Sequence, residues 1–267
     1  MAYDFHSNKS TYFNMQYKNA KEFVLPFVEE VFPVRAGMQV LEIGSAEAGV
    51  LKAFTERGCQ CTGIELQPSR VKLAEEFMAK ELAAGKIRFI ARDIYDIDID
   101  ADLGNKFDLI ILKDVIEHIH DQERFIAQVG NFLNEGGRIF YGFPPWYMPF
   151  GGHQQIAQSK LLSKLPYYHL LPMPLYKLVL KAFGESEKRV DDLVEIKETG
   201  ISIERFERLN KKRQFSSAKK RFYFINPIYS YKFGLQPREQ SGFLAAIPFV
   251  RNFLTTAVYY LMEKEKS

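Results

Sequence analysis

Short apolar runs alternate with amphipathic segments from residue 38 to residue 143 of the chain. This alternation predicts an α/β fold, in which helices cover both faces of a mostly parallel sheet. Gly136-Gly137 is expected to end the last helix of this part. The predicted strands lie at residues 38–43, 59–66, 86–91, 107–112 and 137–143, and the predicted helices between them lie at residues 47–57, 68–84 and 121–134.

The amino-acid composition of the chain changes abruptly after Phe143. Residues 144–200 are rich in proline, aromatic residues and leucine, which indicates an insertion that forms a helical lid. The lid divides the expected core into two parts. Residues 1–143 hold an N-terminal helix and the first five strands, and residues 201–267 return to helix and strand patterns.

Segments outside the alternating part complete the expected sheet. Residues 17–31 predict a helix before the first strand. A helix is expected directly after the lid, with Thr199 or Ser202 as its N-cap. Runs rich in β-branched and aromatic residues at 216–226 and 255–262 predict two late strands. The predicted sheet therefore has seven strands, in a Rossmann-like arrangement.

The charges of the chain are nearly balanced. It has 36 basic and 33 acidic residues, a formal net charge of +3, which is small for a protein whose main task is to neutralise phosphates. Residues 204–221 are locally basic. A nucleic acid is one explanation of this stretch, but a solvated helix face followed by a strand is the commoner one. We expect no nucleic-acid partner.

Cysteine content and hydropathy favour a cytoplasmic protein. Cys59 and Cys61 are too close in sequence for an ordinary disulfide and too few for a zinc site, and we predict no metal site. The N-terminus has no secretory signal pattern, and no uninterrupted apolar run is long enough to span a bilayer. The apolar segments at 165–183 and 244–262 leave a peripheral contact with lipid open.

The turn after the first strand is rich in small residues and carries acids. In the stretch VLEIGSAEAG, Ala46 stands where a dinucleotide-binding turn needs its second glycine, and Glu47 stands where a phosphate would rest on a helix N-terminus. The lysine of a P-loop is missing as well. Because ligands of open parallel sheets bind beyond the carboxyl ends of the strands, this turn predicts a nucleoside-like ligand without phosphate.

Two further acids follow the second and third strands. Glu65 stands about 20 residues after Gly44, where an acid can accept hydrogen bonds from both hydroxyls of a ribose. A solvated carboxylate at a strand end is the alternative. Asp93 can accept a hydrogen bond from the amino group of an adenine, with Ile94 packed on the ring. Both positions favour a nucleoside ligand.

Taken together, these stretches resemble the class I S-adenosylmethionine-dependent methyltransferases, in particular the small-molecule group (methyltransferase types 11 and 23) related to the ubiquinone-biosynthesis O-methyltransferases. The matching motifs are VLEIGSAEAG, GIEL, ARDIYDI, FDLIILKDVIEHI and FLNEGGRIFYGFP, in the family's order. The resemblance implies S-adenosylmethionine as cofactor and S-adenosylhomocysteine as product. Ala46 and Ala48 depart from the family's E-x-G-x-G-x-G pattern. Alanine adopts a positive φ less readily than glycine does.

The resemblance also assigns the cofactor-binding residues. Glu42 is expected to balance the positive methionyl end of the cofactor. The positions that match the family's cofactor site are Glu42, Gly44, Ser45, Ala46, Gly49, Glu65, Leu66, Asp93, Ile94, Lys113 and Asp114.

Methyl transfer needs an acceptor atom aligned opposite the sulfonium, and a base if that atom is a hydroxyl oxygen. His153, in the loop after the fifth strand, is our first candidate for the base, and His118, in the fourth-strand motif, is the second. Either histidine can instead simply order its loop. Asp114 and Glu117 are expected to position the ligands, or to be ordinary acids at a helix start.

The acceptor is predicted from position and family. FPPW at residues 143–146 resembles the N-P-P-Y motif of amino methyltransferases, but that motif belongs after strand four, which argues against nucleic-acid amines. We predict a transferase that methylates a small-molecule or lipid-linked acceptor, at oxygen by family resemblance. The alternatives are a noncatalytic protein that binds the cofactor or its product, a membrane-peripheral methyltransferase that acts on lipid, and a nicotinamide oxidoreductase.

Overall fold

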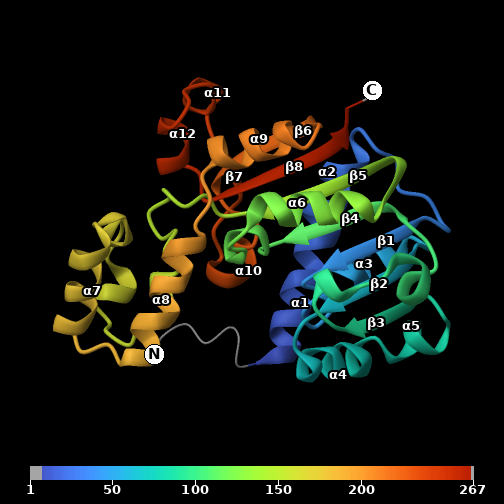
Figure 1. The fold of residues 1–267 in the computed structure, drawn as a ribbon, viewed down its shortest axis with the longest axis horizontal. Coiled ribbons are helices and arrows are strands. Elements are labelled where there is room, and N and C mark those ends of the chain that lie inside the picture. Colours follow the sequence, from blue (N-terminus) through green and yellow to red (C-terminus); the bar gives the residue numbers. More distant parts are fainter. Residues whose placement is uncertain (1–7, 266–267) are drawn as a thin grey trace.

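The structure is a computed structural model that describes residues 8–265. An eight-stranded sheet with the order β3-β2-β1-β4-β5-β8-β6-β7 lies at its centre (Figure 1). Because β1 has β2 on one side and β4 on the other, the strand order reverses at β1. The five parallel strands are β1 (Gln39–Ile43), β2 (Gln60–Glu65), β3 (Ile87–Ala91), β4 (Phe107–Lys113) and β5 (Leu133–Phe143).

The last three strands include one that the sequence analysis missed. β8 (Ala257–Lys264) lies between β5 and β6 (Phe215–Ile225) and is antiparallel to both. The additional strand is β7 (Arg238–Glu239), which pairs with β6 at the edge of the sheet. The predicted count of seven is therefore corrected to eight. A strand of two residues leaves no alternating run in the sequence, so its pairing is visible only in the fold.

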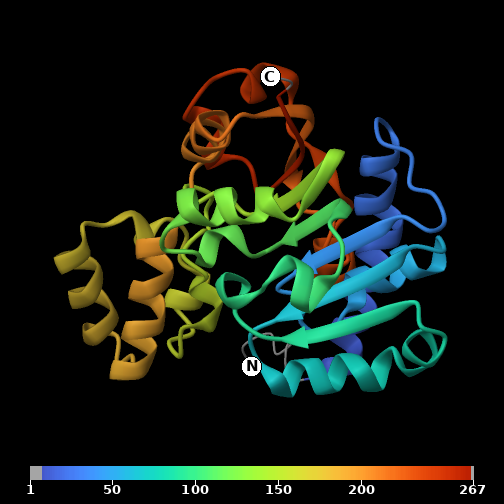
Figure 2. The same cartoon turned by 45° about the vertical axis from the view of Figure 1, so that its right-hand side comes forward.

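Helices cover both faces of the sheet, as predicted, and each face has its own apolar core (Figures 1 and 2). In β4, Leu109 and Ile111 face one core while Ile110 and Leu112 face the other, which explains the unbroken apolar run Leu109–Leu112. The face that contains Leu109 and Ile111 carries α1 (Lys9–Asn19), a π-helical turn (Ala20–Val24), α2 (Leu25–Glu29), α3 (Gly49–Glu56), α4 (Pro68–Phe77) and α5 (Ala79–Ala83). The face that contains Ile110 and Leu112 carries α6 (Gln122–Asn131) and α9 (Ile203–Lys212).

The structure corrects two predicted helix boundaries. The helix predicted at 68–84 is interrupted at Met78, which is buried and has non-helical backbone angles. Gly136-Gly137 does not end a helix, because β5 already begins at Leu133 and contains both glycines. A Cβ on Gly137 would lie 3.1 Å from the carbonyl oxygen of Asp108, so glycine is needed where β5 closes on the irregular start of β4.

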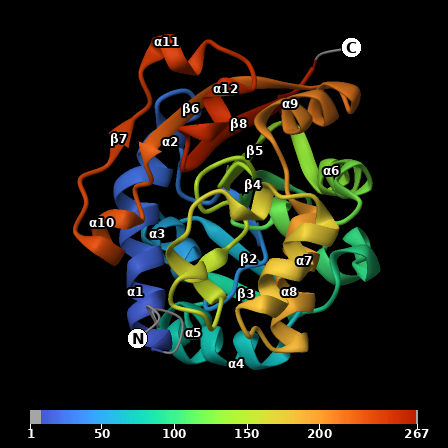
Figure 3. The same cartoon turned by 90° about the vertical axis from the view of Figure 1, so that its left-hand side faces the viewer.

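The inserted segment contains α7 (Met173–Ala182) and α8 (Glu187–Thr199), which lie side by side beyond the sheet (Figures 1 and 3). Tyr168, Tyr176 and Leu193 belong to a separate apolar cluster inside this segment. The side-chain amide of Gln122 donates to the carbonyl oxygen of Thr199 at 2.6 Å and ties α8 to the body. The domain division proposed from the sequence stays a prediction.

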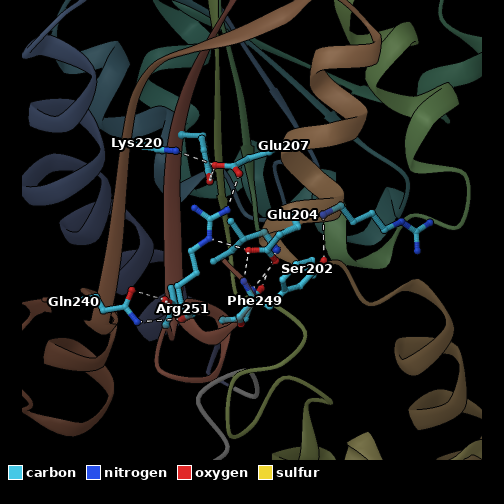
Figure 4. Close-up of polar contacts among 12 residues, drawn as sticks. Ser202, Glu204, Glu207, Lys220, Gln240, Phe249 and Arg251 are labelled. Carbon is cyan, nitrogen blue, oxygen red and sulfur yellow. Dashed lines mark hydrogen bonds and ion pairs between the residues drawn. The ribbon is translucent and has the colours of Figure 1, made fainter. Parts of the chain in front are cut away.

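The C-terminal segment is joined to the rest of the fold by an ion-pair network around the buried Arg251 (Figure 4). Arg251 donates from Nε to Glu204 at 2.9 Å and from a terminal nitrogen to Glu207 at 2.6 Å. Lys220 donates to the other oxygen of Glu207. The segment contains α10 (Tyr229–Phe233), α11 (Gly242–Ala245) and α12 (Val250–Phe253). Further bases of the 204–221 stretch are also paired with acids: Lys212 and Arg213 with Glu123, and Arg221 with Glu30.

Of the two predicted N-caps, Ser202 caps α9 by accepting from the amide of Arg205 (Figure 4). Both cysteines are free and buried, and burial raises the pKa of the Cys59 thiol to about 11. Among residues 8–265, every helix is too short or too polar to cross a bilayer.

Candidate functional site

A cavity of about 790 Å³ opens beyond the carboxyl ends of β1 and β4. Its walls come mainly from five parts of the chain that are far apart in sequence: α1, the turn after β1, the loop after β4, the loop after β5, and the C-terminal segment around α10. Arg70 of α4 lines it as well. The C-terminal contribution, from Asn226 to Leu235, was not predicted. Its side chains reach the cavity only because β6 runs beside β8 toward the same edge of the sheet.

The turn after β1 keeps its left-handed backbone although two of its positions are alanine. Gly44, Ala46 and Ala48 have φ values of +71°, +49° and +66°. A Cβ on Gly44 would meet Val115 at 2.8 Å, so only glycine fits there. The methyl of Ala48 is instead fully buried. Ala46 and Ala48 therefore carry backbone strain, while the turn retains its shape.

The surroundings of Glu47 and Glu42 differ from those that the sequence suggested. α3 begins at Gly49, and Glu47 is turned away from its N-terminus to pair with Lys9 at 2.9 Å and with Arg70 at 3.2 Å. Glu42 is buried, and its Oε2 has no hydrogen-bond partner among the described residues. Burial raises the pKa of Glu42 well above its ordinary value, although the Lys113 ammonium opposes this effect.

Arg70 and Lys9 were missed by sequence reasoning. No local pattern marks a basic residue in the first turn of a helix, or one near the N-terminus, as a partner of Glu47. Their role depends on α1 and α4 both reaching the turn. A Cβ on Gly49 would lie 2.5 Å from the carbonyl oxygen of Phe13, which shows how closely α1 approaches.

Four predicted cofactor residues lie at the ends of β2 and β3, outside the set that lines the cavity. Glu65 is buried and accepts from the amides of Ala46 and Gln67. Leu66 is 65% exposed, whereas Ile94 is buried in the core. Asp93 accepts from the amide of Tyr95. Their cofactor roles stay predictions, and so do those of Glu42, Gly44, Ser45, Ala46, Gly49, Lys113 and Asp114, which do line the cavity.

An ion pair closes the end of β4. Lys113 is buried and pairs with Asp114, whose backbone is left-handed with φ of +57°. Burial raises the pKa of the Asp114 carboxyl, but the neighbouring ammonium outweighs it, and the net pKa lies below the ordinary value. Lys232 of α10 faces the same carboxylate, and burial lowers its pKa. This wall of the cavity therefore combines one acid with two bases.

Glu117, His118 and His153 meet at the wall beyond this ion pair. The ring centroids of the two histidines are 5.1 Å apart, and one donor atom from each of the three residues lies within 4.8 Å of the others. Glu117 is 6% exposed, and neither of its carboxylate oxygens has a hydrogen-bond partner among the described residues. Burial lowers the pKa of the His118 imidazole. The structure thus joins both predicted histidines at one place.

The loop that carries His153 is anchored on the lid. A Cβ on Gly151 would collide with the carbonyl oxygen of Trp146, and one on Gly152 with the ring of His169. Glycine at these two positions therefore allows the loop to pack closely against Trp146 and His169. His153 itself has φ of +51°, a conformation that histidine adopts more readily than most residues.

The apolar side chains of the lid segment serve two different purposes. Met148 and Phe150 line the cavity. Tyr168 and Tyr176 pack inside the lid instead, where they belong to its apolar cluster. Tyr147 packs against Phe253 of the C-terminal segment.

Comparison with known proteins gives several matches that agree with one another. The ubiquinone biosynthesis O-methyltransferase of Idiomarina loihiensis is 28% identical over 191 residues, which cover 62% of this chain and 76% of that protein. The enzyme of the same name from Coxiella burnetii is 24% identical over 117 residues, or 44% of this chain. The chain spans about half the length of most of the curated relatives it matches, 47% in the latter case.

Solved structures share the fold at low sequence identity. A protein described as a sarcosine dimethylglycine methyltransferase from Galdieria sulphuraria has a TM-score of 0.60 at 13% identity, with 93% of this chain and 86% of that chain covered. The plantazolicin methyltransferase BpumL, solved with S-adenosylhomocysteine and a monoazolic desmethylPZN analog, has a TM-score of 0.54 at 13% identity, with 99% of this chain and 88% of that chain covered.

A family model described as a methyltransferase domain matches residues 15–148, from α1 to the loop after β5. This range contains the turn after β1, the Lys113–Asp114 pair and the Glu117–His118 segment. The chain therefore belongs to the methyltransferase-domain family.

Proposed function

We propose that this protein is an S-adenosylmethionine-dependent methyltransferase that methylates an oxygen of a small-molecule or lipid-linked acceptor. The observation that carries the proposal is a single cavity with an acidic, glycine-containing turn on one wall and two histidines on another. The family membership and the named O-methyltransferase relatives support it.

The unsatisfied polar atoms of the cavity fit the cofactor. Glu42 Oε2 and Ser45 Oγ are buried without a hydrogen-bond partner among the described residues, and both residues line the cavity. A buried polar group without a partner is costly, so a ligand with hydrogen-bond donors and positive charge is favoured there. An ammonium and a sulfonium provide both features. A nicotinamide dinucleotide would instead bring a pyrophosphate to a turn flanked by Glu42 and Glu47.

The chemistry is direct transfer. S-adenosylmethionine supplies an electrophilic methyl group, and the carbon–sulfur bond breaks as the acceptor oxygen forms its bond to that carbon, with the electron pair remaining on sulfur. Residues of the chain would orient the acceptor oxygen and take up the proton of its hydroxyl group. His153 and His118, which both line the cavity, are our candidates to take this proton, and Met148 and Phe150 of the same cavity would give the acceptor an apolar contact.

Calorimetric titration of the purified protein with S-adenosylhomocysteine tests the proposal, with NAD as control. We expect binding in the micromolar range to the former alone. Binding of NAD in preference would favour an oxidoreductase. A folded sample that binds neither would overturn the assignment. Binding without consumption of the methyl donor across a panel of phenolic, lipid and small hydroxyl acceptors would favour a noncatalytic protein.

A further inference from the structure

We propose that the acceptor carries a carboxylate, and that Lys232 of α10 binds this group while a hydroxyl oxygen of the same molecule is methylated. This inference names the substrate class of the proposed function and rests on it. Lys232 lies outside residues 15–148, the range that the family model matches. Its role therefore has to be argued from the cavity itself.

The C-terminal segment brings Lys232 into the cavity. α10 lies beside α1 (Figures 1 and 3), and Lys232 is half-buried in the cavity lining. Its ammonium makes no ion pair and no hydrogen bond with the residues that the structure describes. A charged group that is withdrawn from water without a partner is costly, so an anionic ligand is favoured at this position.

The charges around Lys232 leave this wall positive. Only the charges of Asp114 and Lys113 act on it, and these two residues already pair with each other. Burial, together with repulsion from Asp114, raises the pKa of Glu117 well above its ordinary value, which disfavours a second negative charge here. The wall therefore has one ammonium more than it has carboxylates to balance it.

The acids at the other end of the cavity do not change this balance. Glu47 is already paired with Lys9 and Arg70. Glu42 is buried on β1, beside the turn where the cofactor is expected. The excess positive charge thus lies on the part of the cavity that remains for the acceptor.

Further groups of the lining fit an amphipathic acid. Asn226 accepts from the amide of Ile228 through Oδ1 at 3.2 Å, which leaves the donors of its side-chain amide for a ligand oxygen. Lys164 is exposed, lines the cavity and is likewise without an ion pair among the described residues. The apolar residues of the same lining are Met148, Phe150, Ile156, Ile228 and Leu235.

A neutral acceptor would leave the ammonium of Lys232 without a partner, and a free phosphate would leave the apolar lining without a contact. A molecule with an apolar body, a hydroxyl group and a carboxylate satisfies both parts of the wall. The carboxylate would also fix the orientation of the molecule, because a single charged contact at one end restricts which hydroxyl can reach the methyl group.

The test is calorimetric titration with two acids and their methyl esters, with and without saturating S-adenosylhomocysteine. The pairs are caffeate, an aromatic acid, and 3-hydroxydecanoate, an aliphatic one. We expect at least one acid to bind more than about tenfold more tightly than its ester, because the ester keeps the shape and loses the charge.

Lys232→Met should weaken binding of that acid by about ten- to a hundredfold and leave binding of its ester unchanged. Lys232→Arg should keep the preference for the acid, since it keeps the charge. Lys177→Met is the matched control, because this lysine is exposed on α7 and outside the cavity lining; its affinities should equal those of the wild type. Thermal melts show that each variant folds.

Three outcomes would overturn the carboxylate site: neither acid binds, both esters bind as tightly as their acids, or Lys232→Met keeps the preference for the acid. A Lys232→Met variant that loses S-adenosylhomocysteine and the acid to the same extent would assign Lys232 to the cofactor instead. The titrations also separate the two proposals. Binding of S-adenosylhomocysteine without preference for an acid contradicts the carboxylate site alone, whereas failure to bind S-adenosylhomocysteine contradicts the proposed function.

Discussion

The carboxylate of Glu65, at the end of β2, accepts a hydrogen bond of 2.9 Å from the amide of Ala46, in the turn after β1. Its other oxygen accepts from the amide of Gln67 at 3.0 Å. One buried acid thus joins the ends of two neighbouring parallel strands. The bond also fixes the backbone of Ala46 in its left-handed conformation. Glu65 is therefore placed both to shape the turn and to bind a ligand beside it.

Glu65→Ala should weaken binding of S-adenosylhomocysteine by roughly 1–3 kcal/mol, because hydrogen bonds to a charged acceptor are lost. Calorimetry measures the change. Glu65→Gln should weaken binding less than Glu65→Ala does, because its side chain keeps an uncharged acceptor for the Ala46 amide. Glu75→Ala, at an exposed position of α4, is the control and should bind as the wild type does. An unchanged affinity in Glu65→Ala would remove Glu65 from the cofactor site.

Ala46→Gly should raise the free energy of unfolding by roughly 0.5 to 1 kcal/mol, because glycine adopts its φ of +49° without strain. The same change at Ala48 should gain less, since the Ala48 methyl is fully buried. Ala127→Gly, inside α6, is the matched control and should lower stability by about 1 kcal/mol. Urea denaturation measures all three, and a loss of stability in Ala46→Gly would contradict the strain argument.

Stability should fall as the pH drops from about 6.5 toward 4 because of His169. Its ring is fully buried, with Nε2 donating to the carbonyl oxygen of Trp146 and Nδ1 accepting from Gln154. Burial is the main cause that lowers the pKa of His169 to about 4; the Trp146 carbonyl opposes it, and the Lys197 ammonium adds to it. The unfolded chain, with a histidine pKa near 6.5, binds more protons in this window.

Between about pH 6.5 and pH 4, the free energy of unfolding should fall by roughly 3 kcal/mol because of His169. Urea denaturation at several pH values measures it. His169→Gln should flatten this part of the pH profile, although it lowers stability at pH 7.5. His120→Gln removes an exposed histidine and should leave the profile unchanged. Identical profiles for the wild type and His169→Gln would show that His169 does not titrate in this way.

Arg251→Met should lower the free energy of unfolding by about 3 kcal/mol, because it leaves Glu204 and Glu207 without the buried guanidinium shown in Figure 4. Arg251→Lys should not restore the wild-type value, since one ammonium cannot reproduce the two-pronged contact. Arg208→Met, at an exposed position of α9, is the control. If Arg251→Met and Arg208→Met unfold at the same urea concentration, the network does not hold the C-terminal segment.

Local patterns determined much of the fold. The five parallel strands lie within a few residues of their predicted bounds, because a strand buried on both faces leaves a continuous apolar run. The N-cap of α9 was narrowed to Thr199 or Ser202, because an N-cap depends on bonds to residues only three positions away, and the structure selects Ser202. The family was predicted for the same reason, since its motifs are short stretches at strand ends. By contrast, β7 and the break at Met78 depend on contacts with distant residues and escaped prediction.

The site shows the same division. The sequence by itself determined the glycine-containing turn, the buried acid of β1 and the two candidate histidines. Only the tertiary structure decided that Lys9 and Arg70 neutralise Glu47, that α10 closes the cavity with Lys232, and that Glu117 meets both histidines. The physical reason is the range of the interactions. Backbone hydrogen bonds and apolar periodicity act over a few residues, whereas the ion pairs and the cavity join segments that meet only when the sheet has formed.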